Sequence, residues 1–322
     1  MLNSNSRTYL DTNVYSRIAD RCSLPINLGS LGNRTGSQVY LSPINIVEIL
    51  QVTDELRREV LVRVLQEICT DRLLAEPELL IVDFIAERYQ NDSLDQLRLQ
   101  SPFSSTELAR VWRDVKENPA KTFVFDDAIR ERILHLKLFN QLTHVWFKGG
   151  GSFHDNSTAL LGDYHGVSLR EMATLMKQTI DEMKARTPES ENAWPFRDML
   201  LMLVCSLLVV GITPFPEAID KLWQSLAIET TTERLEYVFK GPLGFLLNEG
   251  PLVGMAAVMA HQLSNRFNPG NLLDAFHIVY LPYISELLTF DRAMLTIAHT
   301  YPDSPNFTRV QPADKFVDEL FI

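Results

Sequence analysis

The chain has 322 residues, of which 46% are hydrophobic and 22% are charged, and this is enough apolar material for one large core or two smaller ones. Its formal net charge of −11 argues against non-specific binding of nucleic acid through bulk charge and leaves only a local basic patch for such a role. The three cysteines, Cys22, Cys69 and Cys205, lie far apart, so neither a disulfide framework nor a zinc site is indicated.

No targeting or membrane-spanning segment is visible in the sequence. The first seven residues are polar and lack the apolar core of a signal peptide. The most apolar run, 199–212, is bounded by Asp198 and Pro214 and is too short to span a bilayer, so we expect a buried helix there. The sequence therefore predicts a soluble, cytoplasmic protein without a membrane partner.

The first element of the chain places a carboxylate at the end of a buried strand. Residues 7–10 are short and apolar enough for a strand, and Asp11-Thr12-Asn13 has the chemistry of a turn and a helix N-cap. In open α/β sheets, ligands bind at the carboxyl ends of the strands. Asp11 is then either a site residue or simply the cap of the next helix.

A second strand is predicted at 38–41, after a loop at 23–37. Ser42 is an N-cap followed by proline, so a helix begins at Pro43, and its pattern runs on through Ile68. Glu48 lies in the second turn of this helix. It is either a solvent-facing residue or a carboxylate directed at a ligand.

The middle of the chain is predominantly helical in pattern. After a short strand at 79–83 and a helix at 84–89, helical periodicity dominates in 107–116, 126–146, 168–186, 196–210, 216–226, 233–239 and 252–266. The run Gly149–Gly151 lacks the Gly-Lys-Ser/Thr ending of a phosphate loop and indicates a flexible connector. The sequence thus predicts an all-helical block.

The pattern returns to strands and helices after Asn268-Pro269-Gly270. A helix is predicted from Asn271 to the residue before Pro282, with Asp274 in its first turn, where a carboxylate can also cap the helix. A strand at 284–290 runs into Asp291, which repeats the arrangement at Asp11. A last strand at 307–310 and a helix at 312–320 close the chain.

Four of these stretches resemble the four acidic motifs of PIN-domain nucleases. They are Leu10-Asp11-Thr12-Asn13, Ser42-Pro43-Ile44-Asn45-Ile46-Val47-Glu48, Leu272-Leu273-Asp274-Ala275-Phe276-His277 and Leu288-Thr289-Phe290-Asp291-Arg292. The resemblance implies an α/β protein with a PIN-like three-layer fold and a central, mainly parallel sheet. It covers 1–92 and 266–322, and the helical block at 93–265 would be a large all-α insertion without a counterpart in the small PIN toxins.

The resemblance also implies a metal centre. Asp11, Glu48, Asp274 and Asp291 would be catalytic residues that bind Mg²⁺ or Mn²⁺, since carboxylate oxygens suit these ions. A bound ion would activate water and orient the scissile phosphate.

Four further residues are expected beside this centre. Thr289 would orient the metal ligands or the phosphate, and Asn13 would orient Asp11. Arg292 is either a phosphate contact or a solvated charge. His277 lies one helical turn after Asp274, and we expect it to support the site structurally rather than to act as a general base.

The function implied by the resemblance is that of a metal-dependent endoribonuclease with RNA as its substrate. Such an enzyme would be a toxin held in check by a protein inhibitor or regulator, or a defence effector. Two alternatives stay open: a non-catalytic PIN-like scaffold that recruits partners through its helical block, and a nuclease that acts on DNA. The sequence leaves homo-oligomer formation open as well.

Overall fold

The computed structural model describes residues 7–22, 38–103, 112–114, 117, 163–164, 167–168, 194–213, 215–265, 271–300 and 307–321. The chain divides into two compact units. Unit 1 comprises Met1–Leu80, Leu99–Arg130 and Phe276–Ile322, and unit 2 comprises Ile81–Arg98 and Glu131–Ala275. The boundaries of an insertion at 93–265 stay a prediction.

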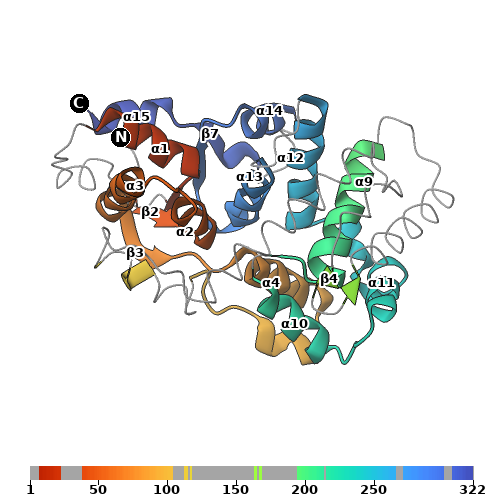
Figure 1. The fold of residues 1–322 in the computed structure, drawn as a ribbon. Coiled ribbons are helices and arrows are strands. Elements are labelled where there is room, and N and C mark those ends of the chain that lie inside the picture. Colours follow the sequence, from red (N-terminus) through yellow and green to blue (C-terminus); the bar gives the residue numbers. More distant parts are fainter. Residues whose placement is uncertain are drawn as a thin grey trace. The chain divides into compact units, whose positions relative to one another are not determined.

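Unit 1 is built on a five-stranded sheet in which all neighbouring strands are parallel (Figure 1). In spatial order its strands are β3 (Cys69–Leu73), β2 (Gln38–Leu41), β1 (Arg7–Leu10), β6 (Glu286–Thr289) and β7 (Val310–Pro312). The predicted α/β class with a parallel sheet is therefore confirmed. Strand β1 occupies the centre, so the residue after it lies between the carboxyl ends of β2 and β6.

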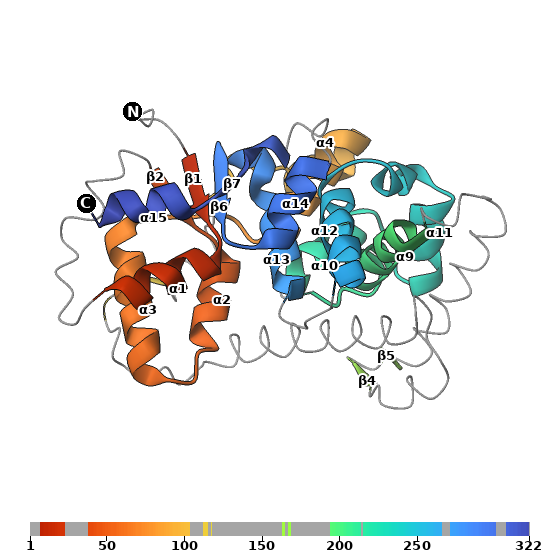
Figure 2. The same cartoon turned by 90° about the horizontal axis from the view of Figure 1, so that it is seen from above.

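Helices pack against one another beside this sheet. Helix α1 (Thr12–Arg21) contacts α2 (Pro43–Leu50), α3 (Glu55–Ile68) and α15 (Asp314–Leu320), and Figure 2 shows these helices together next to the strands. Helix α14 (Arg292–Thr300) contacts β7. Apolar side chains on one face of α1, such as Val14 and Ile18, are completely buried by this packing.

The predicted single helix at 43–68 is wrong, because the structure contains two helices there. Helix α2 ends at Leu50, and α3 starts at Glu55. The side chain of Asp54 accepts a hydrogen bond from the backbone N–H of Arg57 at 3.1 Å, which is a normal N-cap. Asp54 therefore starts a new helix inside a region whose apolar spacing is continuous.

The predicted strand at 79–83 is also wrong. These residues belong to helix α4 (Pro77–Tyr89), and the third strand of the sheet is β3, which pairs with β2. Pro77 is well suited to the first turn of a helix, and the backbone N–H of Leu80 donates to the carbonyl of Glu76 at 3.2 Å. A short apolar run does not distinguish a strand from a buried helix, which explains the error.

Near the C-terminus, the predicted elements are shifted by a few residues. Helix α13 (Asn271–His277) continues as a 3₁₀ helix, η5 (Ile278–Tyr283), that contains Pro282. The predicted strand at 307–310 is a 3₁₀ turn, η6 (Phe307–Arg309), and strand β7 begins only at Val310. The strand at 284–290 is confirmed as β6.

Unit 2 is mainly helical, as predicted. Its longer described helices are α9 (Trp194–Leu203), which continues as a π-helix, η3 (Val204–Val209), α10 (Pro216–Ser225), α11 (Thr231–Phe239) and α12 (Pro251–Asn265). They confirm the helices predicted at 196–210, 216–226, 233–239 and 252–266. Unit 2 also contains most of α4 and two short 3₁₀ helices, η1 (Asp92–Leu97) and η4 (Pro242–Leu247).

The expectation of an all-helical block is wrong at one place. Strand β4 (Asp163–Tyr164) pairs in antiparallel orientation with β5 (Val167–Ser168) and forms a short two-stranded sheet with it. The helices predicted at 126–146 and 168–186, most of that at 107–116, the loop at 23–37 and the connector Gly149–Gly151 lie outside the described residues.

The apolar run at 199–212 is buried, as expected for a core helix. Among the described helices, a different stretch, Pro242–His261, is long and apolar enough to cross a membrane, and half of it is buried within the protein. Part of this stretch is α12, which packs against α9. A core helix passes the same test of length and composition, so this stretch carries little weight as a membrane segment.

Candidate metal centre

Asp11 lies directly after the central strand β1 and is almost completely buried, with 1% of its surface exposed. It occupies the N-cap position of α1, but its side chain makes no capping hydrogen bond. Its backbone N–H donates to the carbonyl of Leu288 at 3.0 Å and so extends the pairing of β1 with β6. The capping interpretation of Asp11 therefore does not explain the position of its carboxylate.

Two side chains hold one oxygen of the Asp11 carboxylate. The hydroxyl of Thr289 donates to Oδ2 at 2.6 Å, and Nδ2 of Asn13 donates to the same oxygen at 2.5 Å. The predicted contact between Asn13 and Asp11 is thus present. Both donors are held in turn, because Thr289 Oγ1 accepts from the backbone N–H of Asp291 at 2.8 Å and Asn13 Oδ1 accepts from that of Phe290 at 3.2 Å.

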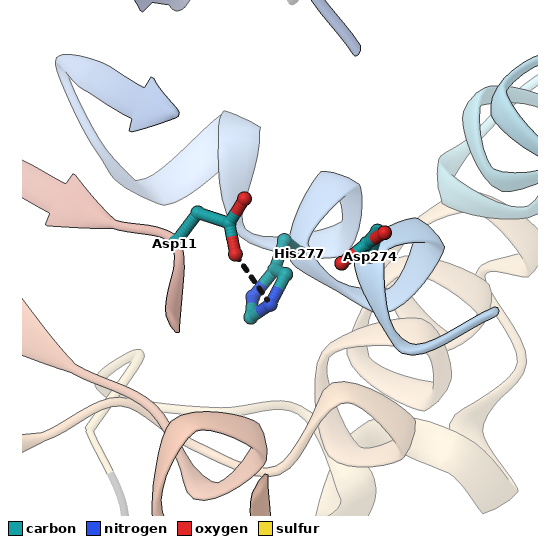
Figure 3. Close-up of side chains that lie close together, drawn as sticks. All are labelled: Asp11, Asp274 and His277. Atoms are coloured by element: carbon teal, nitrogen blue, oxygen red, sulfur yellow. Dashed lines mark ion pairs between the residues drawn. The ribbon is translucent and has the colours of Figure 1, made fainter. Parts of the chain in front are cut away.

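The other oxygen of Asp11 faces His277. Oδ1 lies 3.5 Å from Nε2 of the imidazole, as the dashed line in Figure 3 marks. Because Asn13 and Thr289 both bind Oδ2, the orientation of Oδ1 toward His277 is fixed by two hydrogen bonds. Asp11 therefore presents one oxygen that is not engaged by these donors.

Glu48 is directed at the same imidazole. It is the one residue of α2 that is not buried, and its side chain is only 16% exposed. Oε2 accepts a hydrogen bond from the hydroxyl of Thr12 and lies 3.7 Å from Nε2 of His277. The solvent-facing interpretation of Glu48 is not supported, since its carboxylate turns toward the end of the central strand.

His277 is completely buried, and its two ring nitrogens have different surroundings. Nδ1 forms a short hydrogen bond with the hydroxyl of Tyr9. Nε2 has no hydrogen-bond partner among the described residues, although it faces Asp11 and Glu48. The expected supporting role of His277 does not account for this nitrogen.

Asp274 lies one turn before His277 in α13, and it is partly buried. Figure 3 shows the side chains of Asp274 and His277 on this helix. The place of Asp274 among the metal ligands stays a prediction.

Asp291, which was predicted as a metal ligand, is also a helix cap. Its Oδ1 accepts hydrogen bonds from the backbone N–H groups of Ala293 at 2.5 Å and Met294 at 3.0 Å, so it caps helix α14. The neighbouring Arg292 is exposed at the start of α14. Its expected contact with phosphate stays a prediction.

The charges of these groups influence one another. Burial raises the pKa of Asp11; His277 and the Thr289 hydroxyl oppose this effect, and the charges of Glu48 and Asp291 add to it. Burial lowers the pKa of His277, but the carboxylates of Glu48, Asp11 and Asp291 outweigh burial, so the net shift is upward. Acids from three elements therefore act on one buried position, as a cation site requires.

Comparison of the chain with protein-family models, with curated proteins and with solved structures finds no match. The resemblance to PIN-domain nucleases therefore rests on the four motifs and on the positions of their acids.

The donor set fits a divalent cation. The carboxylates supply hard oxygen ligands, and Nε2 of His277 supplies a nitrogen. Two atoms that each bind an ion at about 2.1 Å can lie at most about 4.2 Å apart. The distances of 3.5 and 3.7 Å from Nε2 to Asp11 and Glu48 are within this limit.

Sequence reasoning missed the polar network behind the site. The hydroxyl of Tyr9 connects His277 to Ser42, and Asn45 connects Ser42 to Thr12. The spacing of Ser42 and Asn45 is that of a capping box, which the sequence could have indicated. Nothing local indicates the pairing of Tyr9 with His277, because 268 positions separate them.

Proposed function

We propose that this protein is a metal-dependent nuclease that hydrolyses phosphodiester bonds, with RNA as its substrate. The observation that carries the proposal is the buried Asp11 carboxylate. Asn13 and Thr289 orient it by hydrogen bonds, and it lies beside the imidazole of His277, which Glu48 also faces. A site that collects this much negative charge at the carboxyl end of a central strand is suited to a divalent ion and a phosphate.

Mg²⁺ or Mn²⁺ bound here would supply a water of lowered pKa and neutralise charge on the phosphate. Asp11 and Glu48 would hold the ion directly, and Asp274 and Asp291 directly or through water. Thr289 and Asn13 would keep Oδ1 of Asp11 in its ligating position through their bonds to Oδ2. Arg292 is exposed at the same strand end and would contact the phosphate chain.

The preference for RNA over DNA and the restraint by a protein partner rest on the resemblance to PIN-domain nucleases, and a cytoplasmic location rests on the three widely spaced cysteines. A non-catalytic scaffold would need none of the four acids, and all four are present. This argument favours an enzyme over a scaffold.

The test is cleavage of labelled single-stranded RNA, hairpin RNA and DNA by the full chain, in Mn²⁺, in Mg²⁺ and in chelator. We expect cutting that needs a metal ion and that Asp11→Asn abolishes. Asp20→Asn is the matched control, because Asp20 lies on the exposed side of α1. Equal cleavage by the wild type and Asp11→Asn would refute the proposal. Cleavage of DNA but not of RNA would show that the substrate is DNA.

A further inference from the structure

We propose that His277 is a direct metal ligand through Nε2 and that this nitrogen makes the centre prefer Mn²⁺ to Mg²⁺. The inference rests on the proposed metal centre. It goes beyond the acidic residues, because it assigns a ligand that is not a carboxylate and an ion that this ligand selects.

The first argument is the state of Nε2. His277 is completely buried, and Nε2 has no hydrogen-bond partner among the described residues. A buried polar atom without a partner is unusual in folded proteins and calls for an explanation. Nε2 points at oxygens of Asp11 and Glu48, and an ion between these atoms would satisfy all three.

The second argument is distance. A protonated imidazole that simply formed an ion pair with these carboxylates would approach to about 2.7–2.9 Å. The observed separations are 3.5 Å to Asp11 and 3.7 Å to Glu48. They are too long for hydrogen bonds of this kind and agree with two ligands of one ion, which lie at most about 4.2 Å apart.

The third argument is the hydrogen bonding on the opposite side of the ring. A histidine that binds a metal through one nitrogen donates the proton on its other nitrogen to a partner that holds the ring. Nδ1 of His277 has such a partner in the Tyr9 hydroxyl. The Tyr9 hydroxyl also lies 2.7 Å from Oγ of Ser42.

The direction of these bonds follows from Asn45. Its Oδ1 accepts from the backbone N–H of Ser42 at 3.1 Å and its Nδ2 donates to the carbonyl of Leu10 at 3.3 Å, so the orientation of the amide is defined. The Ser42 hydroxyl donates to this Oδ1 at 3.0 Å. Tyr9 can then donate to Ser42, and Nδ1 of His277 can donate to Tyr9, so Nε2 is the nitrogen that carries the lone pair when the imidazole is neutral.

The consequence is a preference among ions. Mg²⁺ strongly favours oxygen ligands, whereas imidazole suits first-row transition ions, and Mn²⁺ accepts both ligand types. Replacement of the imidazole should therefore weaken Mn²⁺ binding more than Mg²⁺ binding. The ratio of the two affinities is a measure of the nitrogen ligand.

The experiment uses Mn²⁺ alone as the probe, bound to the full chain in a buffer that does not coordinate metals. Pulsed electron paramagnetic resonance on protein with ¹⁵N only in its histidines should show coupling of a ¹⁵N nucleus to the ion. The coupling should be absent in His277→Asn, in which the amide can still donate to Tyr9 but no atom reaches the position of Nε2. It should persist in Tyr9→Phe and in the control His261→Asn.

Affinity titrations provide a second readout. We expect His277→Asn to lower the affinity for Mn²⁺ by at least about tenfold while the affinity for Mg²⁺ changes by less than about threefold. Bound Mn²⁺ without histidine coupling in the wild type would overturn the inference, whether or not the variant folds. RNA cleavage in that case would leave the nuclease proposal standing. Histidine coupling without any nucleic-acid cleavage would support the ligand and count against the nuclease.

Discussion

The hydroxyl of Thr289 and the carboxylate of Asp11 join the ends of two neighbouring parallel strands through a hydrogen bond of 2.6 Å. Both residues are buried, and 278 positions separate them in the chain. The bond engages Oδ2 of Asp11 and leaves Oδ1 directed at His277. The geometry of the proposed metal ligand is therefore set by a residue that need not touch the ion.

The first prediction concerns this hydroxyl. Thr289→Val keeps the shape of the side chain but removes the donor, and we expect Mn²⁺ affinity to fall about 10–100-fold, as it does when groups that support a metal ligand are lost. Thr289→Ser retains the hydroxyl and should stay within about threefold of the wild type. Thr296→Val, on the exposed side of α14, is the control. Unchanged metal binding in Thr289→Val would contradict an orienting role.

The second prediction concerns the cost of the buried charge on Asp11. Its pKa is raised by burial and by the nearby carboxylates, so the metal-free protein carries this charge at the expense of stability. Asp11→Asn should raise the melting temperature in chelator by about 2–4 °C and abolish the further rise that Mn²⁺ gives to the wild type. A lower melting temperature in chelator would show that the carboxylate contributes to stability without a metal.

The third prediction concerns pH. The pKa of His277 is raised above its unfolded value of about 6.5, so the folded protein retains this proton more strongly than the unfolded chain does. The resulting stability is fully present below about pH 6.5 and is lost as the pH rises through the raised pKa. Urea unfolding in chelator at several values from pH 6 to pH 8 should show stability falling more steeply in the wild type than in His277→Asn. If the free energy of unfolding depended on pH in the same way in both proteins, the raised pKa of His277 would be contradicted.

The fourth prediction separates the two roles of Asp291. Ser can replace Asp as an N-cap, so Asp291→Ser should keep the free energy of unfolding within about 0.5 kcal/mol of the wild type, whereas Asp291→Ala should lose about 1 kcal/mol. Both variants should lose Mn²⁺ affinity, because both remove the charge. Normal metal binding by Asp291→Ser would restrict Asp291 to capping α14.

Several features of the fold follow from local patterns in the sequence. Strands β1 and β2 were predicted with their observed bounds, because short apolar runs end in capping residues at Asp11 and Ser42. The position of Asp291 at a strand end follows from the same reasoning, whereas the local pattern left Glu48 open and only the family resemblance put it beside the other acids. Parallel pairing then brings these strand ends to one edge of the sheet.

Other features depend on contacts that the sequence does not show. The run at 79–83 is equally compatible with a strand and a buried helix, and tertiary packing makes it part of α4. The hydrogen bond between Tyr9 and Nδ1 of His277 forms only when β1 and α13 meet in the folded protein, and so does the position of Nε2 beside Asp11 and Glu48. The sequence placed His277 near the acids only in a supporting role, and its proposed role as a ligand depends on these contacts in the folded protein.

The central claim is that Asp11, Glu48 and His277 surround a divalent cation. Anomalous diffraction at the manganese absorption edge, from crystals of the full chain grown with Mn²⁺, tests it most directly. We predict a peak within about 2.0–2.3 Å of Oδ1 of Asp11 and of Nε2 of His277. An anomalous peak at another place, with no manganese bound to Nε2 of His277, would contradict the account.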